Sequence, residues 1–414
     1  MPVIEKERVQ LEPLYWAKQD VSILDARILV VDDSPLIREL IGACLMTEGY
    51  SNVCYAENGQ DALDVIKLDK PDSIILDLEM PVMDGFELCK KLRSNPEMEH
   101  IPILIQSGRD TAADITRAFD YGASDMVVKP IKKFEILART KVHLEHRFFV
   151  EKLTDFHDRV ASELEQARQL QMDICPSAVE LNDLQNRYGL NIGWHFEPSS
   201  ELGGDIGGIY PVSETKVAFF LADFSGHGVA AALNTFRLQT KLISESSLYE
   251  QPEILLSKLN SFLNKTLRKG SYATMLFGCI DIREGELVYA SAGTQQPLLQ
   301  LPENGPDFSL CCSKGMPLGL LKSWRYERKT VPFGRGARFI LYSDALVEVE
   351  CRPGELLGDA GLKQEVSQIW KTPNAHTVQM QKIIQNFLNR LNGETPDDLT
   401  IIYLENTGVK NDTE

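Results

Sequence analysis

Five short runs of apolar residues, separated by amphipathic stretches, dominate the chain from Arg27 to about Leu144. The runs are Ile28–Val31, Val53–Ala56, Ile74–Leu76, Ile103–Ile105 and Met126–Val128. Strands that are apolar without alternation are buried on both faces, and the helices between them supply that cover. The pattern therefore predicts an α/β domain built on a doubly wound parallel sheet.

A long charged segment without internal glycine or proline follows, from Phe134 to about Ile174. Its apolar residues recur at steps of three and four: Phe149, Leu153, Phe156, Val160, Ala167, Leu170 and Ile174. This spacing predicts a helix with one apolar stripe, which Glu163 interrupts and after which Pro176 is a natural stop. The stripe packs either on a second copy, as a coiled-coil-like pair that makes a homodimer, or on the helix's own domain.

Strand-like runs dominate again from about Asn191 to the end, and helical stretches separate them. The clearest runs are Val217–Ala222, Thr274–Asp281, Leu287–Ala292 and Phe339–Tyr342. They predict an α+β domain with extensive sheet. We expect an N-terminal extension over 1–24, the α/β domain over 25–145, a helical linker over 146–176, the second domain over 177–406 and a flexible tail over 407–414.

The composition bears on the partners of the chain. A net charge of −17 at pH 7 disfavours binding to nucleic acid or anionic lipid, which attract basic surfaces. No run approaches the roughly 20 apolar residues of a membrane span, and the N-terminus lacks the pattern of a secretion signal. The eight cysteines include no CxxC pair, so we expect reduced, mostly buried thiols. These features predict a cytoplasmic protein without a nucleic-acid or membrane partner.

Polar residues stand directly after the strand-like runs of the α/β domain. Asp32 and Asp33 follow the first run, Asp77 the third, Ser107 the fourth and Lys129 the fifth. In a doubly wound sheet these strand ends converge at one edge. Three carboxylates there repel one another unless a cation is bound, and hard oxygen ligands suit Mg²⁺. The hydroxyl and the ammonium would then lie close to a phosphoryl group on the central aspartate.

The segment Asp77-Leu-Glu-Met-Pro-Val-Met-Asp-Gly85 and the pair Lys129-Pro130 resemble two-component receiver domains, and the resemblance covers about residues 25–145. It implies a flavodoxin-like fold, Asp77 as the phosphoacceptor and a sensor histidine kinase as the phosphoryl donor. It assigns Mg²⁺ to Asp32, Asp33, Asp77 and the backbone carbonyl of Glu79, and phosphoryl contacts to Ser107 and Lys129. Met126 stands where receivers usually have Tyr or Phe, so we expect the usual aromatic route from site to surface to differ.

Four acidic motifs punctuate the C-terminal half of the chain. They are Gly203-Gly204-Asp205, Asp223-Phe-Ser-Gly-His-Gly228, Leu341-Tyr-Ser-Asp344 and Pro396-Asp397-Asp398. Because each acid borders an apolar run, its side chain can project from a rigid element. Carboxylates from such distant segments would repel one another in a fold without cations. With two Mn²⁺ or Mg²⁺ ions they would form a hydrolytic centre that acts on a phosphoryl group.

In this order the motifs resemble the metal-dependent (PPM, type 2C) serine/threonine phosphatases of the bacterial stress-response and sporulation branch. Further matches are Thr274-Met275, Ser291-Ala-Gly293, Gly315-Met-Pro-Leu-Gly319 and the segment from Gln169 to Pro176, so the resemblance covers about residues 165–405. It implies a β-sandwich core, with Asp205 and Asp223 as catalytic residues. It assigns the two metal ions to Asp205, Asp223, the carbonyl of Phe224, Asp344 and Asp397, with Asp398 as the second acid of the final pair.

The resemblance implies direct attack of activated water on a phosphoserine or phosphothreonine, without a covalent enzyme intermediate. The expected substrate is a phosphorylated anti-sigma-factor antagonist in a partner-switching pathway. The alternative is a non-catalytic adaptor, with a degenerate phosphatase-like domain that binds a sigma factor or its regulator. Gly208, Ala345 and Thr294 depart from residues common in relatives, and His227 is expected to be a turn residue rather than a general acid.

Overall fold

The computed structural model describes residues 22–408 apart from 109–111, 227, 353, 373–374, 392–394 and 396. Most of the predicted extension, most of the predicted tail and His227 therefore lie outside the described residues. The chain divides into two compact units, Met1–Val160 and Ala161–Glu414.

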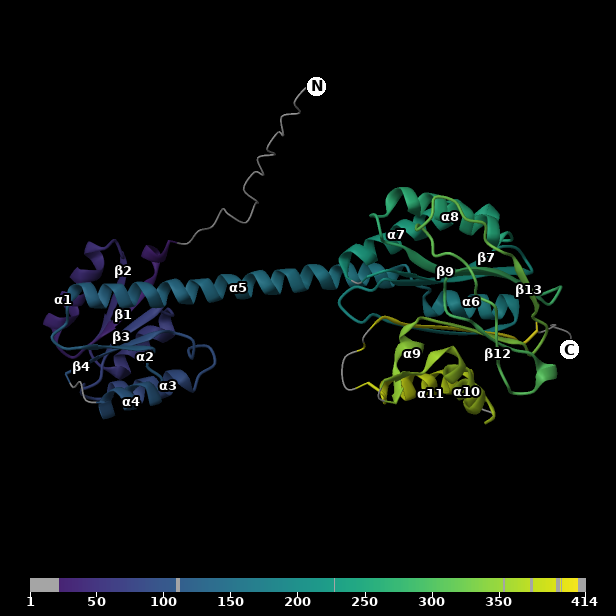
Figure 1. Cartoon of the computed structure of the whole chain (residues 1–414). Helices are drawn as coiled ribbons and strands as arrows, with labels where there is room; N and C mark the ends of the chain where they lie inside the picture. The colour runs from purple at the N-terminus through teal and green to yellow at the C-terminus, as the bar shows by residue number, and fades with distance from the viewer. Residues whose placement is uncertain are drawn as a thin grey trace, which may run out of the picture. The chain divides into compact units, whose positions relative to one another are not determined.

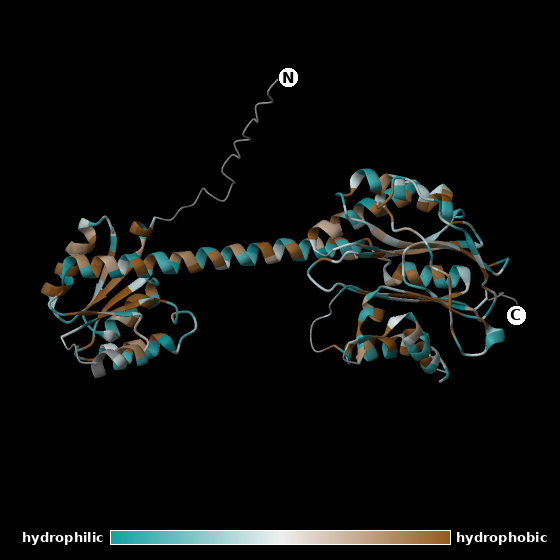
Figure 2. Cartoon of the chain, viewed as in Figure 1, coloured by the Kyte–Doolittle hydropathy of each residue, from teal (hydrophilic) through white to brown (hydrophobic). Residues whose placement is uncertain are grey.

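A five-stranded parallel sheet forms the centre of the first unit, with strand order β2-β1-β3-β4-β5 (Figure 1). The strands are β1 (Arg27–Val31), β2 (Asn52–Ala56), β3 (Ser73–Asp77), β4 (Ile103–Ser107) and β5 (Asp125–Val128). Each apolar run predicted as a strand lies in one of them, and Figure 2 shows these strands as a hydrophobic layer. The predicted doubly wound sheet is confirmed.

Helices cover both faces of this sheet, as continuously apolar strands require. A short 3-10 turn, Ile23–Asp25, precedes the first strand. The helices are α1 (Pro35–Thr47), α2 (Gly59–Leu68), α3 (Gly85–Arg93), α4 (Ala112–Asp120) and the start of α5 (Lys133–Asp173). One core joins α1 and α5 to the sheet through Ile41 and Ile136, and the other joins α2 and α3 through Ile66 and Leu88.

Helix α5 is 41 residues long and contains most of the predicted linker. Its first turns belong to the core of the first unit, since Ile136 and Leu144 are fully buried. Further along, the predicted stripe is open to solvent: Phe149 is 66% exposed, Phe156 55% and Leu170 60%. The helix is confirmed, and its pairing with a second copy stays a prediction. Among the described residues, no helix combines the length and the apolar character needed to cross a membrane.

Two antiparallel five-stranded sheets stack in the second unit, in the orders β13-β10-β9-β8-β7 and β12-β11-β14-β17-β6. The first contains β7 (Asp205–Pro211), β8 (Lys216–Phe224), β9 (Ala273–Asp281), β10 (Glu286–Ala292) and β13 (Lys329–Pro332). The second contains β6 (Leu190–Glu197), β11 (Leu298–Gln300), β12 (Ser309–Leu310), β14 (Arg338–Tyr342) and β17 (Leu399–Asn406). Phe219 of one sheet and Phe339 of the other pack in the same core, so the expected β-sandwich is confirmed.

Helices form an outer layer on each sheet of the sandwich (Figure 1). Helices α7 (Val229–Ser244) and α8 (Pro252–Thr266) pack on the first sheet, whereas α9 (Ala345–Glu348), α10 (Gly358–Trp370) and α11 (His376–Leu388) pack on the second. Helix α6 (Ala178–Tyr188) adds Leu184 and Tyr188 to the core between the sheets. Short pieces complete the unit: β15 (Glu350–Arg352), β16 (Glu355–Leu356) and the 3-10 turns Ser246–Leu248 and Pro302–Asn304.

Candidate functional sites

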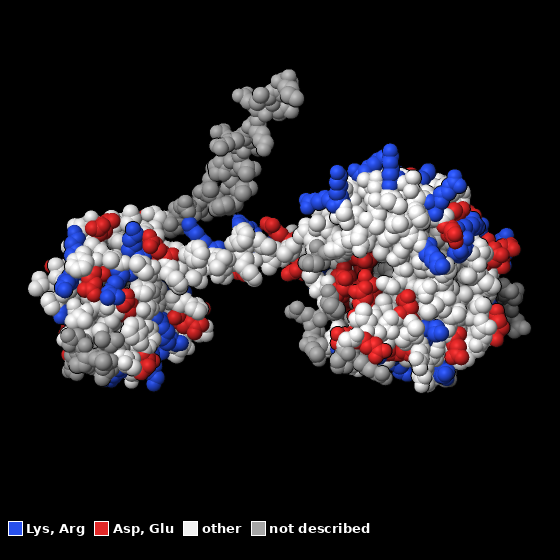
Figure 3. Space-filling view, viewed as in Figure 1, with Lys and Arg blue, Asp and Glu red and all other residues white. Residues whose placement is uncertain are grey.

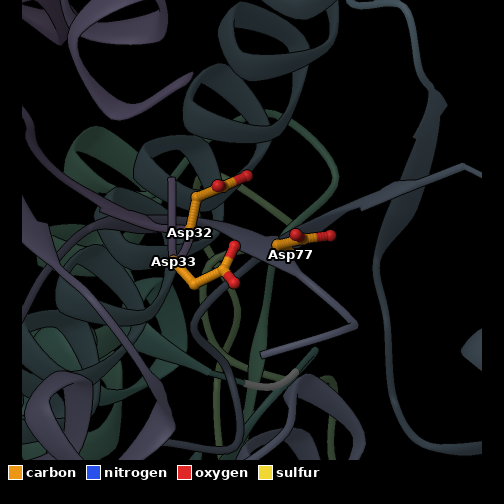
Figure 4. A group of neighbouring side chains, drawn as sticks. All are labelled: Asp32, Asp33 and Asp77. Atoms are coloured by element: carbon orange, nitrogen blue, oxygen red, sulfur yellow. The ribbon is translucent and has the colours of Figure 1, made fainter. Parts of the chain in front are cut away.

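Three carboxylates meet at the carboxyl edge of the parallel sheet, where Asp32, Asp33 and Asp77 approach one another (Figure 4). Each offers a ligand oxygen within 4.8 Å of the others. Asp32 is fully buried and Asp77 is 7% exposed, while Asp33 is open to solvent. Gly85 allows the close approach of α3 to this edge, because a Cβ there would lie 2.4 Å from the carbonyl oxygen of Asp77.

A lysine completes this edge from the end of β5. The Nζ of Lys129 lies 2.8 Å from Oδ2 of Asp77 and 3.2 Å from Oδ2 of Asp32. The Lys129-Pro130 peptide is cis, and the Lys129 amide donates to the carbonyl oxygen of Ser107 at 2.8 Å, so β4 and β5 end together. Burial lowers the pKa of Lys129, but hydrogen bonding and attraction to Asp77 outweigh it and the pKa is raised. Lys129 is therefore a permanent cation at this edge.

The balance of charge at this edge fits a divalent cation. Burial raises the pKa of Asp77 even though Lys129 opposes the shift. Three carboxylates lie together at this edge, and Lys129 contacts two of them with its one ammonium group. The amide of Ser34 donates to Oδ1 of Asp32, and the amide of Leu78 donates to Oδ1 of Asp77, both at 2.9 Å. The remaining oxygens form a hard donor set suited to Mg²⁺. Met126 is buried in the core beneath α2 and α3.

A second group of acids converges from both sheets of the sandwich. Asp205 at the start of β7 stands directly opposite Asp223 near the end of β8. Asp344 follows β14 and Asp397 precedes β17, and these two strands are paired in the second sheet. Asp344 and Asp397 are close enough to Asp223 to repel its carboxylate, so the four acids, far apart in the sequence, lie near one end of the sandwich.

The pKa values of Asp205, Asp223 and Asp344 are raised, first by burial and then by repulsion from neighbouring acids. Burial, followed by repulsion from Asp344 and Asp397, raises the pKa of Asp223 to about 7. Burial and Asp397 raise the pKa of Asp344 to about 6. The pKa of Asp205 is raised well above its usual range by burial and by Asp223, although Thr400 donates a short hydrogen bond to its Oδ2. Such a set lacks a compensating cation, which Mn²⁺ or Mg²⁺ would supply.

The acids of this second group are spaced more widely than those of the first. Within the described part of the chain, Asp32, Asp33 and Asp77 are the only three potential ligands whose donor atoms lie within 4.8 Å of one another. A cation bound among these acids would offset the repulsion that, after burial, raises the pKa values of Asp205, Asp223 and Asp344.

The two acids of the Asp397-Asp398 pair have different surroundings. The carboxylate of Asp398, only 3% exposed, accepts from the amide and hydroxyl of Ser199 at 2.7 and 3.0 Å. It also accepts from the amides of Gly204 and Asp205 at 2.5 and 3.2 Å. Asp397 is exposed, and the amide of Asp398 is its one hydrogen-bond donor among the described residues. Asp398 thus holds the loop before β7, while Asp397 keeps an oxygen for a ligand.

A residue of the matching segment Gln169 to Pro176, to which no role was assigned, holds the same loop. Gln171, near the end of α5 and 2% exposed, donates from Nε2 to the carbonyl oxygen of Gly203 at 2.7 Å. The amide of Gly203 donates back to Oε1 of Gln171 at 3.1 Å. This pair of bonds joins the helix to the residues just before Asp205. The resemblance marks the segment that contains Gln171, but the role of this side chain becomes clear only from its burial and hydrogen bonds.

The three departures from common residues lie in different surroundings. Gly208 lies three positions after Asp205 in β7, and therefore on the opposite face of the strand, against Phe220 and Tyr210. Ala345 is buried at the start of α9. The hydroxyl of Thr294 forms a cluster with the hydroxyls of Ser291 and Ser313, at 3.0 and 2.8 Å.

Two family models match the chain, the response regulator receiver domain over residues 28–141 and the stage II sporulation protein E (SpoIIE) family over residues 213–407. The chain joins a receiver domain to a SpoIIE-type domain. The predicted resemblance to both families is confirmed.

Relatives of the receiver domain include the response regulators MprA of Mycolicibacterium vanbaalenii and Mycobacterium avium. The first is 41% identical over 121 residues, 29% of this chain and 51% of the relative. The second is 42% identical over 118 residues, 28% of this chain and 50% of the relative. The chain spans about half the length of these relatives.

The SpoIIE-type domain resembles a solved phosphatase structure, the SiaA-PP2C domain of Pseudomonas aeruginosa. The TM-score is 0.51 at 18% sequence identity, and the match covers 61% of this chain and 98% of the other. At this identity the likeness shows the fold, which is that of the PP2C phosphatases.

Proposed function

We propose that the chain is a response regulator whose receiver domain, phosphorylated on Asp77, controls a metal-dependent serine/threonine phosphatase. The observation that carries this proposal is the convergence of Asp205, Asp223, Asp344 and Asp397 at one end of the sandwich, with the pKa values of the first three raised. Acids that repel one another in a partly buried site lower the stability of the fold, and bound cations would offset that repulsion.

In this proposal, Asp344 and Asp397 would hold the first cation, and Asp205 would contribute on the side of the second. Asp223 would be a ligand common to both cations, and the carbonyl of Phe224 would be a further ligand. When bound, Mn²⁺ or Mg²⁺ would polarise the phosphoryl group and make water more acidic. The chain's own residues orient this centre, since Thr400 donates to Asp205 and so aims its free oxygen. Asp398 positions Asp205 through the amides of the preceding loop.

The receiver site has the parts needed for an aspartyl phosphate. Asp32, Asp33, Asp77 and the carbonyl of Glu79 would hold Mg²⁺, and Lys129 would pair with the phosphoryl oxygens that replace its present contact with Asp77. Ser107, buried at the end of β4, is the proposed hydroxyl partner of the phosphoryl group. A sensor histidine kinase is the proposed phosphoryl donor.

The linker helix is the proposed route of control. Its stripe, exposed at Phe149, Phe156 and Leu170, would pair with a second copy of the chain and make a homodimer. Gln171 ties the end of the same helix to the loop before Asp205, so a change in how the helices pair would reach the metal site. The proposed domain boundaries are those expected from the sequence, with the linker over 146–176.

The proposed substrate is a phosphorylated anti-sigma-factor antagonist in a partner-switching pathway. The resemblance of the four acidic motifs to phosphatases of that branch supports this choice. A non-catalytic adaptor would need none of the four repelling acids, and the experiment below separates the two functions.

Hydrolysis of an aryl phosphate by the purified full chain with Mn²⁺ tests the proposal. Wild type, Asp223→Ala and the control Asp183→Ala, which removes an exposed acid from α6, would be compared with and without beryllofluoride. We expect activity in wild type and control, its loss in Asp223→Ala, and a rate that changes with beryllofluoride. Absence of both hydrolysis and Mn²⁺ binding in wild type would favour the adaptor.

A further inference from the structure

Lysine and arginine side chains gather over α7 and α8 of the SpoIIE-type domain, although the chain has a net charge of −17 (Figure 3). Six exposed cations there form no ion pair with a carboxylate among the described residues, and we call them the basic rim. They are Arg237, Lys265, Arg268, Lys269, Lys322 and Arg325. Two other cations of this layer, Lys241 and Lys258, share an ion pair with Glu245, at 2.5 and 2.9 Å.

The basic rim borders the catalytic end of the sandwich. Arg268 and Lys269 lie in the turn between α8 and β9, which a bond from the Ser271 amide to the Arg268 carbonyl closes at 3.0 Å. Tyr272 and Ser225 exchange hydrogen bonds of 2.9 and 3.0 Å, and Ser225 lies two residues after Asp223. Four residues span at most about 14 Å, so Arg268 lies within that distance of Tyr272, whose hydrogen-bond partner Ser225 directly follows β8 and is close to Asp223 in sequence.

The rest of the basic rim is fixed to α8 by polar contacts. Nη1 of Arg237 donates to the carbonyl oxygen of Thr266 at 3.4 Å. Asn264 and Asn260 of α8 donate to the carbonyl oxygens of Gly319 and Leu321, at 2.7 and 3.0 Å. The segment that leads to Lys322 and Arg325 therefore runs along this helix. It also exposes apolar side chains, namely Leu320 (41%), Leu321 (42%) and Trp324 (41%).

We propose that the basic rim docks an acidic segment of the phosphoprotein substrate, an inference that rests on the proposed phosphatase activity. The acids of the catalytic site repel a phosphate dianion, whereas cations beside them attract an acidic chain and raise its local concentration. Whenever a phosphorylated residue reaches Asp223, its neighbours in sequence must lie along the border of the site. An anionic membrane would also be attracted to the basic rim, but only a bound substrate must place its chain along the border of the catalytic site.

The geometry sets the position of the acidic segment. An extended peptide advances about 3.3 Å per residue, so three to five residues cover about 10 to 17 Å, a range that includes the limit of about 14 Å between Arg268 and Tyr272. Acidic side chains three to five positions from the phosphorylated residue would therefore reach Arg268 and Lys269. Acids directly beside the phosphorylated residue would instead face the catalytic carboxylates and be disfavoured.

Phosphopeptide hydrolysis by the full chain with Mn²⁺ tests this inference. Two peptides would share one phosphoserine and differ only at positions three to five beyond it, where one has Glu and the other Gln. The readout is the ratio of their kcat/KM values in wild type, in Arg268→Glu/Lys269→Glu and in the control Lys371→Glu/Lys382→Glu. The control makes the same change in net charge on residues of the opposite helical layer.

At low salt, we expect kcat/KM for the Glu peptide to exceed that for the Gln peptide about tenfold in wild type and control, and this ratio should fall at high salt. In Arg268→Glu/Lys269→Glu, the ratio should fall to one or below. Equal hydrolysis of both peptides by wild type would overturn the docking inference while leaving the phosphatase proposal intact. If wild type hydrolysed none of the three substrates, the two peptides and an aryl phosphate, the result would instead contradict the phosphatase proposal. A different result would identify the rim as a membrane-binding surface: wild type sediments with phosphatidylglycerol vesicles, Arg268→Glu/Lys269→Glu does not, and the kcat/KM ratio of the two peptides in wild type is near one.

Discussion

Replacement of Asp223 by Asn should stabilise the metal-free protein at alkaline pH. Burial and repulsion from Asp344 and Asp397 raise the pKa of Asp223 from 3.8 to about 7. Because this pKa is raised on folding, the side chain's contribution to stability is fully present below about pH 3.8 and is lost as the pH rises to about 7. Above that range the wild-type chain folds with an uncompensated charge at this position, whereas the side-chain amide of the variant is neutral.

The size of the effect follows from the shift. About three pKa units at 1.36 kcal/mol each correspond to about 4 kcal/mol, and partial solvation of the site reduces this to about 2 to 4 kcal/mol. The free energy of unfolding of Asp223→Asn should therefore exceed that of wild type by this amount at pH 8 in a chelator. The difference should shrink toward zero near pH 4, where the wild-type carboxyl is neutral in the folded state and the pH is close to the unfolded-state pKa of 3.8.

Urea unfolding followed by tryptophan fluorescence measures this difference. Three of the four tryptophans, Trp194, Trp324 and Trp370, lie in the SpoIIE-type domain, and the receiver range 25–145 has none. The signal therefore follows the domain that contains the substitution. Asp183→Asn, an exposed acid of α6, serves as the control and should show no pH-dependent difference from wild type.

Addition of Mn²⁺ should reverse the order of stability, because a cation that binds only the folded state stabilises it and the variant lacks a ligand. A difference between wild type and Asp223→Asn that stays the same from pH 5 to pH 8 would refute the electrostatic reasoning. So would a wild-type chain that is the more stable of the two at pH 8 in the chelator.

Three further predictions follow from particular contacts. Gln171→Met removes both hydrogen bonds to the loop before β7, so it should lower the free energy of unfolding by about 2 kcal/mol and kcat for an aryl phosphate about tenfold. Gln169→Met, at an exposed position on the same helix, should change neither quantity. Asp77→Asn should abolish the effect of beryllofluoride on the hydrolysis rate, and a persistent effect would place the switch elsewhere. Thr400→Val should raise the Mn²⁺ concentration for half-maximal activity several-fold, because Asp205 loses its donor, and Thr400→Ser should restore it.

The sequence by itself determined the receiver domain and its site. Its five apolar runs are local features, and parallel strands end at one edge whatever the details of packing. Residues directly after those runs, such as Asp32, Asp77 and Lys129, therefore had to meet, and the structure brings Lys129 within hydrogen-bonding distance of both acids. For the second domain, the strand-like runs predicted only extensive sheet, and the β-sandwich was implied by the family resemblance that the ordered motifs carry.

Only the tertiary structure decided how neighbouring polar residues divide their tasks. Asp397 and Asp398 are adjacent and chemically identical, yet one is exposed and the other accepts four hydrogen bonds. Gln171 looks like any polar helix residue until the fold buries it against Gly203. The basic rim likewise depends on a turn and an extended segment that meet along α8. Periodicity and motifs report which side chains a local element presents, whereas burial and hydrogen-bond partners depend on contacts between segments far apart in the chain.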